Sequence, residues 1–175
     1  ELLAPRDHTG LSLSPTPTLY YYVSGPVLWP TRFTIRAPGR PAPVLEINIP
    51  PPRGAGVYAL SVADYRVRLE PGIIYTWSVS VVLDPKTPAR DVVASASLLV
   101  TATGLPLVDA SRATPAPRRA GAFAQAGLWY DAVAAAAAAE PFDRHVALDA
   151  LMTEVGLVAP AESDRRHAGP APLGR

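Results

Sequence analysis

Alternating apolar and polar residues recur in short runs along the first 100 positions, and such alternation is typical of half-buried β-strands. Turn-forming residues, many of them prolines, separate the runs. Seven runs are found, covering 11–14, 18–23, 32–37, 44–49, 56–62, 74–83 and 91–100. Seven short strands with turns between them predict a mainly β fold, an antiparallel β-sandwich of the immunoglobulin or fibronectin type III kind, over residues 1–100.

The sixth run is the most distinctive of the seven. Pro71 and Gly72 supply a turn, because proline presets one backbone dihedral and glycine accepts the next at little steric cost. Tyr75 and Trp77 then fall on one face of the strand, with threonine and serine on the other. A turn followed closely by tyrosine resembles a tyrosine corner, in which the phenol bonds to upstream backbone. These four residues are therefore predicted to have structural roles.

The pattern changes beyond the last strand. Residues 101–117 are rich in glycine, proline, serine and threonine, which predicts a linker. A helical period then runs over 118–140, and Asp143 is a plausible N-cap for a second helix that Gly156 closes. The pattern predicts a helical hairpin over 118–157. Residues 158–175 are polar and proline-rich, and we expect them to be flexible or to follow a partner surface.

The first predicted helix partly resembles a tetratricopeptide repeat, through Phe123-x2-Ala126-Gly127-x2-Tyr130. In this interpretation Gly127 permits close contact between helices and Tyr130 faces the hairpin. The second half of the repeat pattern is missing, and one unit cannot form a solenoid. We therefore expect a packing helix rather than a peptide-binding repeat.

Exposed aromatic residues are the predicted partner-binding sites. Trp129 and Tyr130 are adjacent, so they point to different sides of their helix. Trp129 either anchors the helix to the sandwich or forms an interaction hot spot, for which tryptophan is a favoured residue. Tyr20 and Tyr22 lie on the face of their strand opposite the expected core. Trp129, Tyr20 and Tyr22 are therefore the candidate contacts with a partner.

Composition excludes several classes of function. The formal net charge is +1, with 16 basic and 15 acidic residues, so no overall field favours nucleic acid. No apolar run approaches the about 20 residues that a membrane span needs. Cysteine is absent, which excludes disulfides and thiolate metal sites. Glutamate rather than methionine at position 1 suggests a cleaved export signal, and hence a periplasmic or secreted protein.

Motifs for catalysis are also missing. His8, His145 and His167 have no metal-binding spacing, and the sequence lacks a nucleophile elbow and a phosphate-binding loop. Asp84 and Asp91 could offer oxygens to calcium, although aspartate before proline is ordinary turn chemistry. The sequence predicts no catalytic residue, no metal and no cofactor.

Four segments together suggest a family. They are Leu11-Ser12-Leu13-Ser14-Pro15-x-Pro17-Thr18-Leu19-Tyr20-Tyr21-Tyr22-Val23, Leu69-Glu70-Pro71-Gly72-x-x-Tyr75-Thr76-Trp77-Ser78-Val79, Asp84-Pro85 and Ala126-Gly127-Leu128-Trp129-Tyr130-Asp131-Ala132. In this order they resemble the bacterial family called domain of unknown function 928, over about Thr9 to Leu157. The Gly-x-Trp-Tyr-Asp-Ala element is the most specific part. The resemblance implies an exported protein and supplies no catalytic residues.

The function expected from the sequence is that of an exported, non-enzymatic accessory module that docks on a partner protein or a larger extracytoplasmic complex. A carbohydrate-binding or cell-surface-binding sandwich is the alternative. An enzyme would require carboxylates such as Glu46, Asp64 and Asp91 to converge in a cleft.

Overall fold

The computed structural model describes residues 1–101, 116–154 and 156. Its strands are β1 (Gly10–Ser12), β2 (Thr18–Val23), β3 (Thr31–Arg36), β4 (Leu45–Ile49), β5 (Gly56–Ser61), β6 (Ile74–Val81) and β7 (Val92–Val100). Each strand lies within two residues of the bounds that alternation predicts. Two short 3-10 turns, η1 (Val62–Tyr65) and η2 (Pro88–Arg90), lie in the connections.

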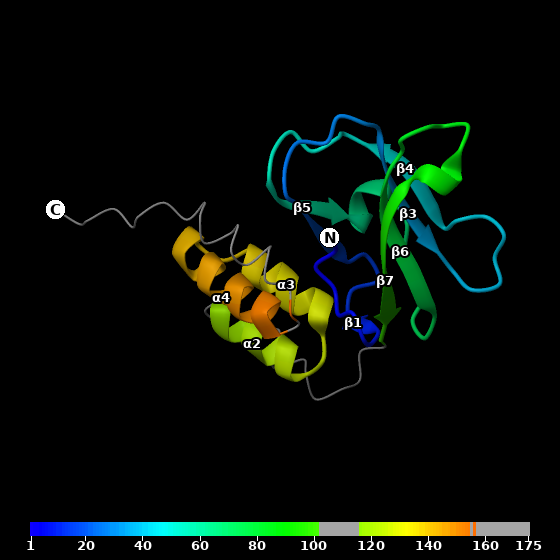
Figure 1. Ribbon diagram of the computed structural model, residues 1–175. Helices are drawn as coiled ribbons and strands as arrows, with labels where there is room; N and C mark the ends of the chain where they lie inside the picture. The colour runs from blue at the N-terminus through cyan, green and yellow to red at the C-terminus, as the bar shows by residue number, and fades with distance from the viewer. Residues whose placement is uncertain (102–115, 155, 157–175) are drawn as a thin grey trace.

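The strands form two sheets. Five lie in the order β1-β7-β6-β3-β4, and β2 pairs with β5 (Figure 1). The prediction of a wholly antiparallel fold is wrong, because β1 runs parallel to β7. The N-terminal segment explains the difference: Leu2 first pairs antiparallel with Tyr21 of β2, and the chain then crosses to the other sheet.

A single hydrophobic cluster joins both sheets and the helices. Leu19 contributes from the small sheet, Phe33 and Trp77 from the large one, and all three are completely buried. The rings of Phe33 and Trp77 meet edge to face with centroids 6.3 Å apart. Alternation along β6 thus directs its large side chains into a core shared by the two sheets.

The turn before β6 has the geometry that its sequence predicts. Gly72 adopts a φ of 84°, a conformation that favours glycine. The Tyr75 hydroxyl accepts a hydrogen bond from the backbone N–H of Glu70 at 2.9 Å. The tyrosine therefore ties the strand to the turn five residues upstream, and the predicted upstream contact is confirmed.

We expect Tyr75→Phe to lower the free energy of unfolding by about 0.5–1.5 kcal/mol, the net value of one hydrogen bond. Urea denaturation followed by tryptophan fluorescence measures this change. Thermal and urea stability equal to the wild type would show that the bond contributes nothing.

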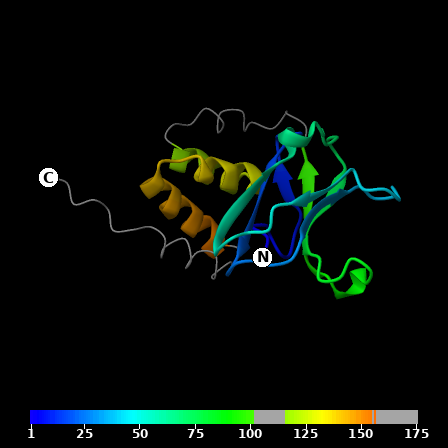
Figure 2. The ribbon, with the colours of Figure 1, turned by 90° about the horizontal axis from the view of Figure 1, so that it is seen from above.

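The described residues contain three α-helices, α2 (Ala116–Gln125), α3 (Trp129–Ala137) and α4 (Pro141–Glu154). Both views show the three helices together on one side of the sheets (Figures 1 and 2). The predicted hairpin is therefore wrong, since the run 118–140 forms two helices instead of one. Proline at the first position of α4 also replaces Asp143 as the helix start.

Gly127 causes the break between α2 and α3. Its φ is 73°, its N–H donates to Ala124 O, and the Leu128 N–H donates to Phe123 O. This pair of bonds is a Schellman motif, which glycine terminates because an L side chain is strained in that conformation. Gly127 therefore ends a helix, so this segment lacks the continuous first helix of a tetratricopeptide repeat, which the missing second half of the pattern had already argued against. Most of the predicted linker and the predicted tail 158–175 lie outside the described residues.

Candidate functional site

The segment that distinguishes this sequence, Trp129-Tyr130-Asp131, forms the first turn of α3. Its three side chains each hydrogen-bond to a different part of the β-structure. We call this set of contacts the α3 junction. Because α3 packs against both β1 and β2, the junction sits where the helices meet the sheets.

Tyr130 enters the core between the sheets and is 2% exposed. Its hydroxyl accepts a hydrogen bond from Trp77 Nε1 at 2.8 Å and donates one to the carbonyl oxygen of Ser97 at 2.9 Å. Burial raises the pKa of the Tyr130 phenol, so it stays protonated and able to donate. The polar partners of Tyr130 therefore lie on β6 and β7, and not on the other helices.

Trp129 lies over the N-terminal segment. Its Nε1 donates to the carbonyl oxygen of Leu3 at 3.0 Å, and the side chain is 6% exposed. The Leu3 N–H in turn donates to Tyr20 O of β2 at 2.9 Å. Of the two interpretations of Trp129, the structure supports the one in which it anchors its helix, and the expectation of an exposed hot spot is wrong.

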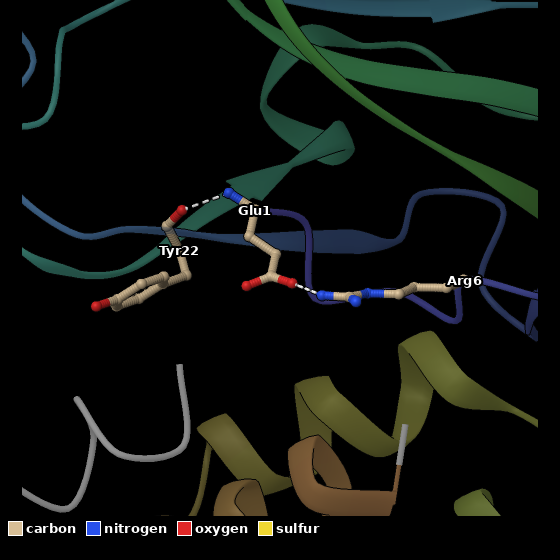
Figure 3. A network of polar contacts seen from close by, with 3 residues as sticks. All are labelled: Glu1, Arg6 and Tyr22. Carbon is tan, nitrogen blue, oxygen red and sulfur yellow. Dashed lines mark hydrogen bonds and ion pairs between the residues drawn. The ribbon is translucent and has the colours of Figure 1, made fainter. Parts of the chain in front are cut away.

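The N-terminal segment is fixed to β2 at a second point. The backbone nitrogen of Glu1 donates to Tyr22 O at 2.8 Å, and the Glu1 carboxylate forms an ion pair with Arg6 (Figure 3). Tyr22 is 7% exposed and Tyr20 is half-buried. α3 packs against β2, and the predicted exposure of Tyr22 is wrong, while Tyr20 is only partly exposed.

Asp131 completes the junction. Its Oδ2 accepts a hydrogen bond from the Leu13 N–H at 2.8 Å, just beyond the end of β1. Burial raises the pKa of the Asp131 carboxyl, while the bonds from Leu13 and Ser12 act in the opposite direction. An acidic group in the first turn of a helix is also favoured by the helix dipole. The sequence analysis gave Asp131 no role, since its partner lies 118 residues away.

We expect Asp131→Asn to become more stable relative to the wild type as the pH rises. The raised pKa means that the folded state holds the proton more tightly, so the contribution of Asp131 is complete below about pH 4 and declines as the carboxyl ionises. Urea unfolding at pH 4 and pH 7 measures the difference. Asp7→Asn is the control, because contact with His8 lowers the pKa of that exposed carboxyl. If the wild type instead gains free energy of unfolding relative to Asp131→Asn between pH 4 and pH 7, the raised pKa of Asp131 is contradicted.

A family model described as Domain of Unknown Function (DUF928) matches residues 1–164. The chain belongs to this family. Searches of curated proteins and of solved structures give no match. In this DUF928 chain, the Gly-x-Trp-Tyr-Asp-Ala element that carries the resemblance is the structural junction between helices and sheets.

The candidate catalytic and metal-binding groups of the DUF928 chain lie apart. Glu46 is on β4 beside Arg36, Asp64 is in η1 and Asp91 precedes β7. Asp84 uses both carboxylate oxygens in its own turn, accepting from the Lys86 N–H and the Thr87 hydroxyl at 2.9 Å each. Across the described ranges no three His, Cys, Asp or Glu residues are placed to hold a metal ion. Of the histidines, His8 is hydrogen-bonded to its neighbour Asp7, and the side chain of His145 and all of His167 lie outside the described residues.

One end of the large sheet exposes apolar side chains instead. Thr31 pairs with Val81, and Val81 pairs with Val92, so the residues at and just beyond these positions lie at the same end of β3, β6 and β7. Four of them form what we call the loop-end patch, namely Leu28 (81% exposed), Trp29 (47%), Leu83 (36%) and Val92 (61%). The sequence analysis missed this patch because Leu28 and Trp29 lie between strands, where no periodic pattern marks them.

Proposed function

We propose that this protein is a non-enzymatic accessory module that docks on a partner protein through the loop-end patch. The observation that carries the proposal is the exposure of Trp29 beside Leu28, since tryptophan in an apolar surface dominates many protein interfaces. Next to the patch, the Val82 N–H donates a hydrogen bond to Pro30 O at 2.8 Å, which ties the segment after Trp29 to the end of β6. A rigid apolar surface loses little conformational entropy on binding.

We also infer that the two sheets form an immunoglobulin-like sandwich. The N-terminal segment pairs with β2 and then, as β1, with β7, which is the way a first strand divides between the two sheets in such domains. The bond from Tyr75 to the upstream backbone supports the same assignment. The β2–β3 and β6–β7 loops would then lie at the end that immunoglobulin variable domains use for recognition, and they carry the patch.

The proposed location is outside the cytoplasm, in the periplasm or the secreted fraction. The basis for this location is the resemblance of the sequence to the domain of unknown function 928 family, which implies an exported protein. Fractionation of the source cells, with an antibody against the protein, is the direct check. Recovery only with cytoplasmic markers would remove this part of the proposal.

Cross-linked pull-down from the source cells tests the docking surface. We expect the wild type to recover a specific protein, and the double variant Leu28→Ser, Trp29→Ser to lose most of it. Tyr65→Ser is the matched control, because Tyr65 is an exposed aromatic residue (36%) on η1, away from the patch. Equal recovery by all three proteins, or none by any, would count against the proposal.

Carbohydrate binding is a second candidate, and one hollow favours it. A hollow of about 420 Å³ beside β5 is lined by Tyr58, Tyr65 and Arg53 together with apolar residues. Sugars commonly stack on aromatic rings, whose faces carry negative charge. A glycan array with the wild type and Tyr65→Ser tests it, and absence of any binder would remove this candidate.

A further inference from the structure

The hollow beside β5 opens between the two sheets. Its lining comes from both of them, with Ile49 at the end of β4 on one side and Tyr58 and Leu60 of β5 on the other. In the described chain β4 and β5 are edge strands of their sheets, which leaves the gap between them open. Its volume of about 420 Å³ is enough for a small molecule, since ligand pockets in proteins measure about 300–1,000 Å³.

Tyr21 of β2 supplies the observation that points to a ligand. It lines the hollow and is only 4% exposed. No hydrogen bond to its hydroxyl is found within the described ranges, whereas buried polar groups in proteins are nearly always bonded. Burial, together with nearby Tyr58, raises the pKa of Tyr21 to about 12, so the hydroxyl is protonated at neutral pH. This hydroxyl is therefore able to bond a polar group of a molecule in the hollow.

The rest of the lining suits a flat apolar body. Tyr58 and Tyr65 add aromatic rings, and two prolines add apolar surface. The Tyr58 ring stacks on Tyr21 with centroids 5.6 Å apart, and its hydroxyl donates to Gly54 O at 3.0 Å, so its position is fixed. Aromatic rings pack favourably against one another in offset or edge-to-face arrangements. The lining therefore favours an aromatic ring in the hollow.

Arg53 adds a positive charge at the exposed side of the hollow. It is exposed, it lines the hollow, and it forms no ion pair within the part of the chain that the structure describes. A guanidinium group pairs well with a carboxylate, because its N–H groups match the two carboxylate oxygens. The hollow thus combines a buried hydroxyl, aromatic rings and an unpaired cation.

We propose that this hollow binds a small aromatic carboxylate that carries a second polar group at the far end of its ring. The carboxylate pairs with Arg53, and the second polar group bonds the Tyr21 hydroxyl. The ring packs against Tyr58 and Tyr65. A sugar is a poorer fit, because several of its hydroxyl groups would be buried against apolar atoms that cannot bond them. The inference does not rest on docking through the loop-end patch, with which the hollow shares no residue.

Isothermal titration calorimetry with three probes tests each contact. The probe para-hydroxycinnamate has both polar groups, cinnamate lacks the ring hydroxyl, and para-hydroxycinnamamide lacks the charge. We expect the wild type to bind para-hydroxycinnamate most tightly of the three. Tyr21→Phe should weaken para-hydroxycinnamate by about 2–10-fold, the net value of one hydrogen bond, and leave cinnamate unchanged. Arg53→Gln should weaken both carboxylates by about 2–5-fold at low salt, because the arginine is exposed, and leave the amide unchanged.

Tyr22→Phe and Arg68→Gln are the matched controls. Tyr22 is a buried tyrosine on the same strand as Tyr21 and Arg68 is an exposed arginine, and neither lines the hollow. Both variants should bind the three probes as the wild type does. Urea unfolding of Tyr21→Phe should also match the wild type, since the Tyr21 hydroxyl has no bond to lose, and this keeps the binding result separate from folding.

Three results would overturn the proposal. The first is the absence of saturable binding of para-hydroxycinnamate to the wild type. The second is a loss in Tyr21→Phe that cinnamate shares, or a loss in Arg53→Gln that the amide shares. The third is tighter binding of glucose or glucuronate than of para-hydroxycinnamate, which would assign the hollow to a sugar.

Discussion

Replacing Tyr130 by phenylalanine is expected to lower the free energy of unfolding by about 1–3 kcal/mol, the cost of leaving one buried polar group, here the Trp77 Nε1–H, without a partner. The substitution removes one oxygen and keeps the ring. It leaves the Trp77 Nε1–H, which is completely buried, and the Ser97 carbonyl without their partner. Chemical denaturation followed by circular dichroism measures the loss.

Tyr22→Phe is the matched control for this experiment. Tyr22 is 7% exposed, close to the burial of Tyr130, but no hydrogen bond to its hydroxyl is found among the described residues. We expect this variant to remain close to the wild type. Equal losses for the two variants would mean that the Tyr130 hydroxyl has no special role.

Gly10→Ala is expected to destabilise the protein by about 1–3 kcal/mol, the usual cost of overpacking a core. A Cβ atom at Gly10 would lie 2.7 Å from Cε2 of Tyr130, closer than real contacts allow. The ring cannot easily move away, because its hydroxyl is bonded to both β6 and β7. Gly10 therefore provides the space on β1 that Tyr130 needs to enter the core.

Gly121→Ala serves as the comparison in the same unfolding assay. A Cβ atom at Gly121 meets no other heavy atom within 4 Å. Within a helix, alanine is more favourable than glycine by about 0.5–1 kcal/mol, so this variant should be slightly more stable than the wild type. A Gly10→Ala protein as stable as Gly121→Ala would contradict the close packing of Tyr130 on β1.

The strands could be predicted because each one is a local pattern. In β6, for example, the alternation of Tyr75 and Trp77 with polar residues fixes which face is buried, whatever the rest of the chain does. The parallel pairing of β1 with β7 could not be predicted, since it joins residues far apart in sequence. Local alternation identifies a strand, but it does not identify its neighbour.

The α3 junction likewise could not be predicted from local sequence patterns, because its contacts join residues far apart in the sequence. Gly127 carried a local signal for a helix end, yet the alanine-rich run around it favoured one continuous helix. Trp129 and Tyr130 were recognised as important from their type. Their partners, Leu3 and Trp77, depend on the tertiary fold, and so the sequence could not distinguish an exposed aromatic site from a buried one.

The central claim of this account is that the α3 junction makes the helices and sheets a single cooperative unit. Native-state hydrogen exchange of amides in α3 and β6, in the wild type and in Tyr130→Phe, tests it most directly. The account predicts that both elements open with the same free energy in the wild type and that the substitution lowers both by the same amount. Loss of protection in α3 alone, with β6 unchanged, would show that the helices are a separable appendage and would contradict the claim.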